Sequence, residues 1–117
     1  MTGHKRSMGI KGEELAVRYL MNKGFQIIER NFRCRMGEID IVARDGNYLV
    51  FVEVRTRSRS QYGLALETIT RAKIKKLRQL ASFYLVRHPQ DRLFIRFDVV
   101  AVNWAGDTEI THIDNAF

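Results

Sequence analysis

The chain has 117 residues and a formal net charge of +7 at pH 7, with 45% hydrophobic and 28% charged residues. This length and composition are typical of one globular domain, and they exclude the disordered and collagen-like classes. No apolar run reaches the roughly 18–20 residues of a membrane span. The single cysteine, Cys34, excludes an intrachain disulfide and a cysteine-rich zinc site. We therefore expect a cytoplasmic protein with no membrane partner.

The first predicted element is a helix from about residue 12 to residue 23, ended by Gly24, the residue preferred just past a helix end. We expect residues 1–8 to be a flexible segment and residues 9–117 to form the single domain. Glu13 lies inside the apolar stripe of this helix. Because an inward carboxylate is costly unless something compensates it, Glu13 is a candidate site residue. The competing interpretation is an acid that only offsets the helix macrodipole.

Three strands are predicted next, over residues 25–33, 38–44 and 48–56. The last two flank an Asp-Gly-Asn sequence that is a strong hairpin signal. With a turn at Asp45-Gly46, Asp40 lies opposite Phe51, and Glu53 is its diagonal neighbour on the same face. Diagonal neighbours lie about 7–8 Å apart, so the two carboxylates can share one cation.

Oxygen ligands alone, with no thiolate, suit a hard ion such as Mg²⁺ or Mn²⁺. Glu13 can pack over the same sheet face and supply a third oxygen. Arg55, two residues after Glu53, points to the same side and can hold a phosphate oxygen. Carboxylates, a hard metal and a cation are the parts needed for phosphodiester hydrolysis. The competing interpretation is a plain salt bridge between Asp40 or Glu53 and a nearby arginine.

The rest of the chain is predicted to form a helix over residues 70–87 and strands over residues 93–103 and 109–113. The order αβββαββ indicates the α/β class, a mixed β-sheet flanked by helices. Residues 55–78 carry eight Lys and Arg against one acid, which equals the whole net charge. Such a concentration attracts polyanions, although a solvated helix face and a basic loop would look alike. The candidate nucleic-acid contacts are Arg33, Arg35, Arg57, Arg59, Arg71, Lys73, Lys75 and Arg78.

Five segments resemble the YraN-like family of small bacterial proteins: GIKGE at 9–13, GF at 24–25, GEID at 37–40, FVEVR at 51–55 and RFDVV at 96–100. The resemblance implies a restriction-endonuclease-like, or PD-(D/E)XK, core. Its two strand acids and the hairpin between them are similar to those of archaeal Holliday-junction resolvases. Carried over by position, it makes Glu13, Asp40 and Glu53 the catalytic acids. Asp40, Glu53 and the Val54 carbonyl would bind metal, with Glu13 completing or tuning the site.

The resemblance further implies a Mg²⁺-dependent endonuclease acting on DNA, in particular branched or structured DNA, and by analogy with the resolvases a homodimer. Arg55 departs from the pattern, which has lysine there. A lysine can help deprotonate the attacking water, whereas an arginine stays protonated. Arg55 can still clamp the phosphate, and Lys73 is a candidate replacement cation. Two alternatives stay open: a non-catalytic nucleic-acid-binding module, and a protein-interaction subunit whose basic face meets an acidic partner.

Overall fold

The computed structural model describes residues 2–57, 69–90, 92–104 and 107–117, with side chains from residue 9 onward. Its helices and strands are α1 (Thr2–Asn22), β1 (Gln26–Cys34), β2 (Gly37–Asp45), β3 (Tyr48–Arg57), α3 (Arg71–Arg87), β4 (Phe94–Asn103) and β5 (Glu109–Ile113). The elements of the described residues follow the predicted order, and each strand lies within one residue of its predicted bounds. In this described part of the chain, no helix combines the length and hydropathy that a bilayer crossing requires.

Helix α1 begins at Thr2, about ten residues before the predicted start, so residues 2–8 continue the helix. No proline interrupts this stretch. Two glycines, Gly9 and Gly12, weaken its helix propensity, which is why the sequence pattern placed the start too late. Gly12 has a packing role, because a Cβ there would overlap the side chain of Thr56 on β3. The glycine lets α1 pass close to the sheet.

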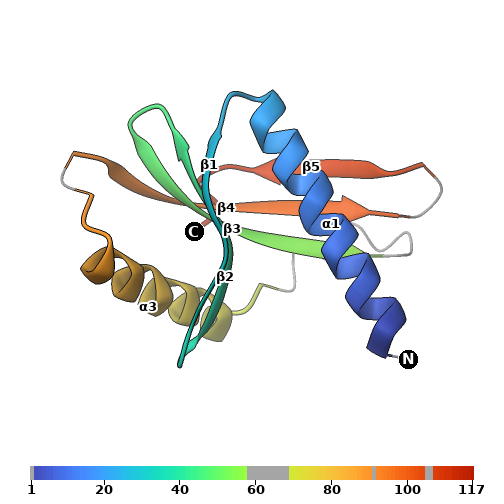
Figure 1. The fold of residues 1–117 in the computed structure, drawn as a ribbon, viewed down its shortest axis with the longest axis horizontal. Coiled ribbons are helices and arrows are strands. Elements are labelled where there is room, and N and C mark those ends of the chain that lie inside the picture. Colours follow the sequence, from blue (N-terminus) through green and yellow to red (C-terminus); the bar gives the residue numbers. More distant parts are fainter. Residues whose placement is uncertain (1, 58–68, 91, 105–106) are drawn as a thin grey trace.

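The five strands form one mixed sheet in the order β1-β2-β3-β4-β5, in which only the β3–β4 pair is parallel. The connection between these parallel strands contains α3, as a parallel pair requires a long crossover. Helices α1 and α3 pack on opposite faces of the sheet (Figure 1). The prediction of an α/β protein with a mixed sheet is therefore confirmed.

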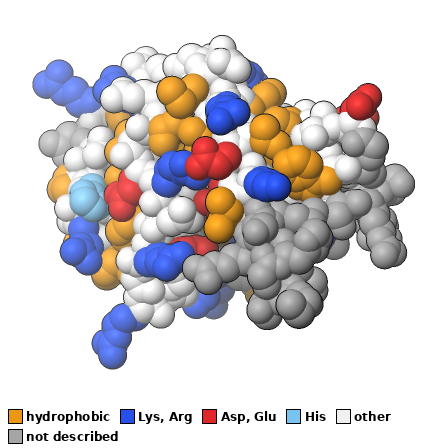
Figure 2. All heavy atoms as spheres, turned by 45° about the vertical axis from the view of Figure 1, so that its right-hand side comes forward, with side chains coloured by type: hydrophobic (Ala, Val, Ile, Leu, Met, Phe, Trp, Pro, Cys, Tyr) orange, Lys and Arg blue, Asp and Glu red, His pale blue; other side chains and the backbone are white. Residues whose placement is uncertain are grey.

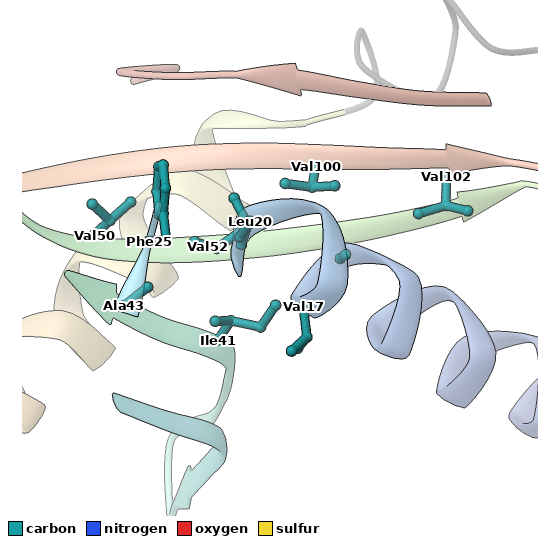
Figure 3. Close-up of a cluster of buried hydrophobic side chains, with 10 residues drawn as sticks. Val17, Leu20, Phe25, Ile41, Ala43, Val50, Val52, Val100 and Val102 are labelled. Atoms are coloured by element: carbon teal, nitrogen blue, oxygen red, sulfur yellow. The ribbon is translucent and has the colours of Figure 1, made fainter. Parts of the chain in front are cut away.

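Each face of the sheet carries its own hydrophobic core. The core beneath α1 (Figure 3) contains Ala16, Val17, Leu20, Phe25, Ile41, Ala43, Val50, Val52, Val100 and Val102. The core beneath α3 contains Phe32, Ile39, Val42, Leu49, Phe51, Leu77, Leu80, Ala81 and Tyr84. Alternate residues of β3 enter different cores, so this central strand is buried on both faces. The end of β3, which carries polar side chains, therefore belongs to a strand that is packed on both faces.

The β2–β3 turn lies one residue later than predicted. Asp45 pairs with Tyr48, and Gly46, with a φ of 59°, takes the first central position of the turn. A glycine at this position suits the turn geometry that follows the twist of a hairpin. The register shifts by two residues, so every side chain keeps its predicted face. The prediction that Asp40 and Glu53 are diagonal neighbours is wrong. When the observed register is continued by one residue beyond Ile41 and Val52, Asp40 lies directly across from Glu53.

Candidate functional site

Asp40 and Glu53 meet where the regular pairing of β2 and β3 ends. The ladder runs from the turn to its last pair, Ile41 with Val52, and the two acids come next. Here the main-chain N–H of Val54 donates to Asp40 Oδ2 at 2.8 Å. A side-chain hydrogen bond joins the two carboxyl groups, and Glu53 is only 6% exposed. The structure thus brings together the two strand acids that the sequence singled out.

The electrostatics of this pair favour a bound cation. Burial and the charge of Glu53 raise the pKa of Asp40 to about 8, against the opposing effect of the Val54 N–H. The charge of Glu13 adds to the increase. Without a bound metal ion, the Asp40 carboxyl is therefore protonated at neutral pH. A divalent ion could take the place of this proton and relieve the repulsion between the two carboxylates.

Two basic side chains reach the same oxygen of Glu53. Lys73 Nζ lies 3.3 Å from Glu53 Oε2, and Arg55 Nη1 lies 3.6 Å from it. Lys73 is on helix α3, whereas Arg55 is on β3 with Glu53. Among the candidate nucleic-acid contacts that the structure describes, Lys73 alone also forms an ion pair with this acid pair. The contact places Lys73 beside the acid pair, where the sequence analysis named it as a candidate replacement cation.

The start of α3 sets the position of Lys73. Thr70 caps the helix, and its side-chain oxygen accepts the N–H of Lys73 at 3.1 Å. One turn later, Leu77 and Leu80 are buried against the sheet, and Lys73 lies on their side of the helix. The cap and this buried stripe hold the first turn of α3 beside Glu53.

Glu13 lies in a separate cleft beside the acid pair. This cleft of about 400 Å³ is lined by Gly9, Ile10, Glu13, Arg30, Asn31, Arg33 and Glu38. Burial and the charge of Glu38 raise the pKa of Glu13, while a hydrogen bond from Asn31 lowers it. Glu13 influences Asp40 through its charge. Among the described residues, however, no three His, Cys, Asp or Glu side chains gather closely enough to hold a metal.

The chemistry of the acid pair fits a hard divalent cation that keeps part of its hydration. Two carboxylates supply oxygen ligands, as Mg²⁺ and Mn²⁺ prefer. The Val54 carbonyl points to the same side of β3 as the Val54 N–H, because both groups of a strand residue face one neighbouring strand. Mg²⁺ commonly binds one or two carboxylates and retains several waters. The missing third carboxylate is therefore no obstacle to this ion.

The predicted basic contacts lie in three places. Arg71, Lys75 and Arg78 are exposed on the outer face of α3, where they line a groove of about 410 Å³. Arg57 ends β3 and is half-buried. Arg59 lies outside the described residues. On the face drawn in Figure 2, the described side chains mix both signs of charge with hydrophobic groups.

Two further predicted contacts belong to the tip of the β1–β2 hairpin. Arg33 pairs with Glu38 at 2.9 Å, and Arg35 is exposed in the turn. This tip is separate from the outer face of α3. The predicted basic contacts that the structure describes therefore divide among separate surfaces, which the sequence pattern does not predict.

Sequence reasoning missed a buried polar network on the α1 face. Asp98 accepts hydrogen bonds from Arg96 Nε and Nη2, each at 2.9 Å, and from the Asn115 N–H, and it contacts His112 at 2.7 Å. Arg96 also pairs with Asp45 at 3.0 Å. Burial by itself raises the pKa of Asp98, but the hydrogen bonds from His112 and Arg96 outweigh this effect and lower the pKa below its ordinary value. The signal was an Arg and an Asp two positions apart in an apolar strand, which share one face.

Fold and site together define a small α/β protein with a buried acid pair beside two cations. The chain matches "Uncharacterised protein family UPF0102" over residues 12–102. It is 47% identical over 118 residues to a UPF0102 protein of Geobacter metallireducens, covering 100% of this chain and 97% of the relative. A Pelotomaculum thermopropionicum relative is 45% identical over 120 residues, with 100% of both chains covered. A Caldicellulosiruptor saccharolyticus relative is 42% identical over 117 residues, covering 97% and 99%.

The chain therefore belongs to the UPF0102 family, and its resemblance to the YraN-like proteins is confirmed. The restriction-endonuclease-like core that this resemblance implies stays a prediction, as do the metal and the nucleic acid. The assignment extends over nearly the whole chain, because the relatives named above and this chain cover one another almost completely.

Proposed function

We propose that this protein is a divalent-metal-dependent nuclease on a restriction-endonuclease-like core, with DNA as its substrate. The observation that carries the proposal is the contact between Asp40, which is partly buried, and Glu53, which is buried, at the end of the β2–β3 ladder. Two cations on Glu53, Lys73 and Arg55, complete the set of groups. A strongly perturbed carboxyl pKa beside a second acid and two cations is typical of functional sites, and this supports the proposal.

In this proposal, Asp40, Glu53 and the Val54 carbonyl hold Mg²⁺ or Mn²⁺. When bound, the ion polarises the phosphate and makes its coordinated water more acidic. Arg55 stays protonated and holds a phosphate oxygen, where it stabilises the charge that develops during cleavage. Lys73 supplies the lysine that the PD-(D/E)XK nuclease pattern has at position 55 and orients the water or the phosphate.

Glu13 tunes the acid pair through its charge, since it stands near enough to raise the pKa of Asp40 without joining a group of three ligands. Arg71, Lys75 and Arg78 hold the phosphate backbone along the outer face of α3. Contacts of this kind bind nucleic acid with little dependence on base sequence, and they weaken as salt rises.

A cleavage assay tests the proposal directly. Wild-type protein is incubated with duplex and four-way DNA in Mg²⁺ or Mn²⁺, beside Asp40→Asn and Glu53→Gln. Asp114→Asn and Glu109→Gln, two exposed acids near the end of the chain, are the matched controls. We expect the site variants to lose about a hundredfold or more in rate and the controls to keep the wild-type rate. Equal rates in site and control variants contradict the proposal.

A second candidate is a nucleic-acid-binding module that does not cut. It is favoured by Arg55 in the lysine position of the nuclease pattern and by the lack of a third carboxylate ligand among the described residues. Its signature is tight DNA binding with no cleavage in either metal. Recovery of cleavage in Arg55→Lys would then identify the arginine as the reason.

A further inference from the structure

A small apolar pocket lies between the first turn of α3 and the C-terminal end of the chain. It has a volume of about 180 Å³ and is lined by Ile69, Ile74, Val99, Ile113, Ala116 and Phe117. None of these residues belongs to the acid pair or to its two cations. The pocket is therefore a feature that the proposed cleavage site does not use.

The pocket opens beside a basic groove. Ile74 lines both the pocket and the groove on the outer face of α3 that holds Arg71, Lys75 and Arg78. The Arg78 guanidinium lies 6.0 Å from the centre of the Phe97 ring. Phe97 in turn stacks on Phe117, which lines the pocket, with ring centres 5.4 Å apart. Aromatic, apolar and cationic groups thus form one continuous surface.

This combination matches the two halves of a nucleotide. A flat base can enter an apolar pocket with an aromatic wall, and the phosphates on either side can reach the cations. A fully paired duplex offers its phosphates alone, because its bases are stacked inside. An uncharged apolar ligand would leave the three cations unused. The surface therefore fits a strand with an exposed base better than either of these.

We infer that this pocket takes up an unpaired base of a nucleic-acid strand, with the adjoining phosphates on Arg71, Lys75 and Arg78. The inference rests on the proposed function in taking nucleic acid as the ligand. It adds the form of the substrate, which is DNA with at least one unpaired nucleotide.

Fluorescence anisotropy in EDTA, where no cleavage occurs, tests this inference. The probes are a labelled duplex and the same duplex with one bulged nucleotide. We expect wild-type protein to bind the bulged DNA about tenfold more tightly, the size expected for stacking one base. Ala116→Leu fills the pocket and should abolish this preference while duplex affinity stays the same. Arg71→Gln should weaken binding to both probes equally.

Equal affinity of the wild type for both probes overturns the inference, and so does an undiminished preference in Ala116→Leu. If thermal unfolding shows that Ala116→Leu is not folded, Ile69→Phe, at another lining position, fills the pocket and replaces it.

The outcomes separate this inference from the proposed nuclease activity. A protein that cuts duplex DNA with Mg²⁺ but binds both probes equally contradicts the base pocket alone. A protein that prefers the bulged probe but never cuts contradicts the nuclease proposal alone.

Discussion

Two carboxyl groups in contact behave differently from two separate ones, because the charge of each opposes ionisation of the other. Burial and the charge of Glu53 raise the pKa of Asp40 to about 8, whereas an unperturbed aspartate has a value of 3.8. The folded protein therefore binds more protons than the unfolded chain between these two values. The stability that this proton contributes is fully present below the lower value and is lost as pH rises through the upper one.

This titration gives a prediction for stability. In EDTA, raising the pH from about 6 to about 8.5 should lower the free energy of unfolding of the wild type by on the order of 1–2 kcal/mol. Asp40→Asn should remove most of this decrease, since it has no proton to lose. Urea denaturation at the two pH values measures the effect, with Asp114→Asn as the control. The same decrease in Asp40→Asn would contradict the assignment.

Lys73 gives a prediction for activity. Lys73→Gln removes the cation that α3 places on Glu53, so cleavage should fall about ten- to a hundredfold. Lys76→Gln removes an exposed cation of the same helix and should leave the rate near that of the wild type. Steady-state cleavage assays with the two variants compare them. Equal rates would show that Lys73 only adds to the surface charge.

Single side chains were predictable where one element sets their direction. Strand alternation correctly predicted that Asp40 and Glu53 lie on one face. The error in the position of the turn did not change this, because a register shift of two residues keeps every side chain on its face. The contact of Lys73 with Glu53 depends on how α3 lies across the sheet, which the helix pattern does not contain. The pairing of Asp98 with His112 likewise depends on the placement of β5 beside β4.

Helix α1 shows what periodicity leaves out. Its end at Gly24 was predicted, and there the N–H of Phe25 donates to the Leu20 carbonyl across a residue with a φ of 97°. The start of α1 was not predicted, because glycine lowers helix propensity whatever its surroundings. Gly12 is retained by packing against Thr56, a contact between distant parts of the sequence. Tertiary packing therefore overrides the local preference.

Gly9 and Gly12 of α1 form a matched pair for a stability prediction. Gly12→Ala should destabilise the protein by about 1–3 kcal/mol, because the added Cβ meets the Thr56 side chain. Gly9→Ala should stabilise it by about 0.5–1 kcal/mol, since nothing lies within 4 Å of its Cβ and alanine favours the helix. Thermal or urea unfolding measures both. A similar effect of both substitutions would show that α1 does not pack on β3 as described.

The charge of the whole molecule governs how it meets a polyanion. The net charge of +7 equals the excess in residues 55–78, and the exposed cations of that stretch on α3 are Arg71, Lys75, Lys76 and Arg78. Of the other predicted contacts that the structure describes, Arg33 and Arg35 lie at the hairpin tip, Arg57 at the end of β3 and Lys73 beside Glu53. Composition predicts that the protein binds polyanions, and this stays a prediction; how the described cations divide over the surface follows from the fold.

Salt dependence measures this surface. DNA affinity should fall steeply as salt rises, and each phosphate contact that is removed should lower the slope of log affinity against log salt by about one. Arg71→Gln and Lys75→Gln together should therefore reduce the slope by about two. Arg18→Gln, on the exposed side of α1, should leave it unchanged. An identical slope in all variants would contradict binding along α3.

The most direct test of the whole account is the binding of a divalent ion to the acid pair. Isothermal titration calorimetry with Mn²⁺ near neutral pH should detect one site in the wild type and in Asp114→Asn. It should detect none in Asp40→Asn. The wild type should also release a proton as the ion binds, because the Asp40 carboxyl is protonated beforehand. Unchanged Mn²⁺ binding in Asp40→Asn, or no binding in the wild type, would contradict the metal site from which the proposed cleavage follows.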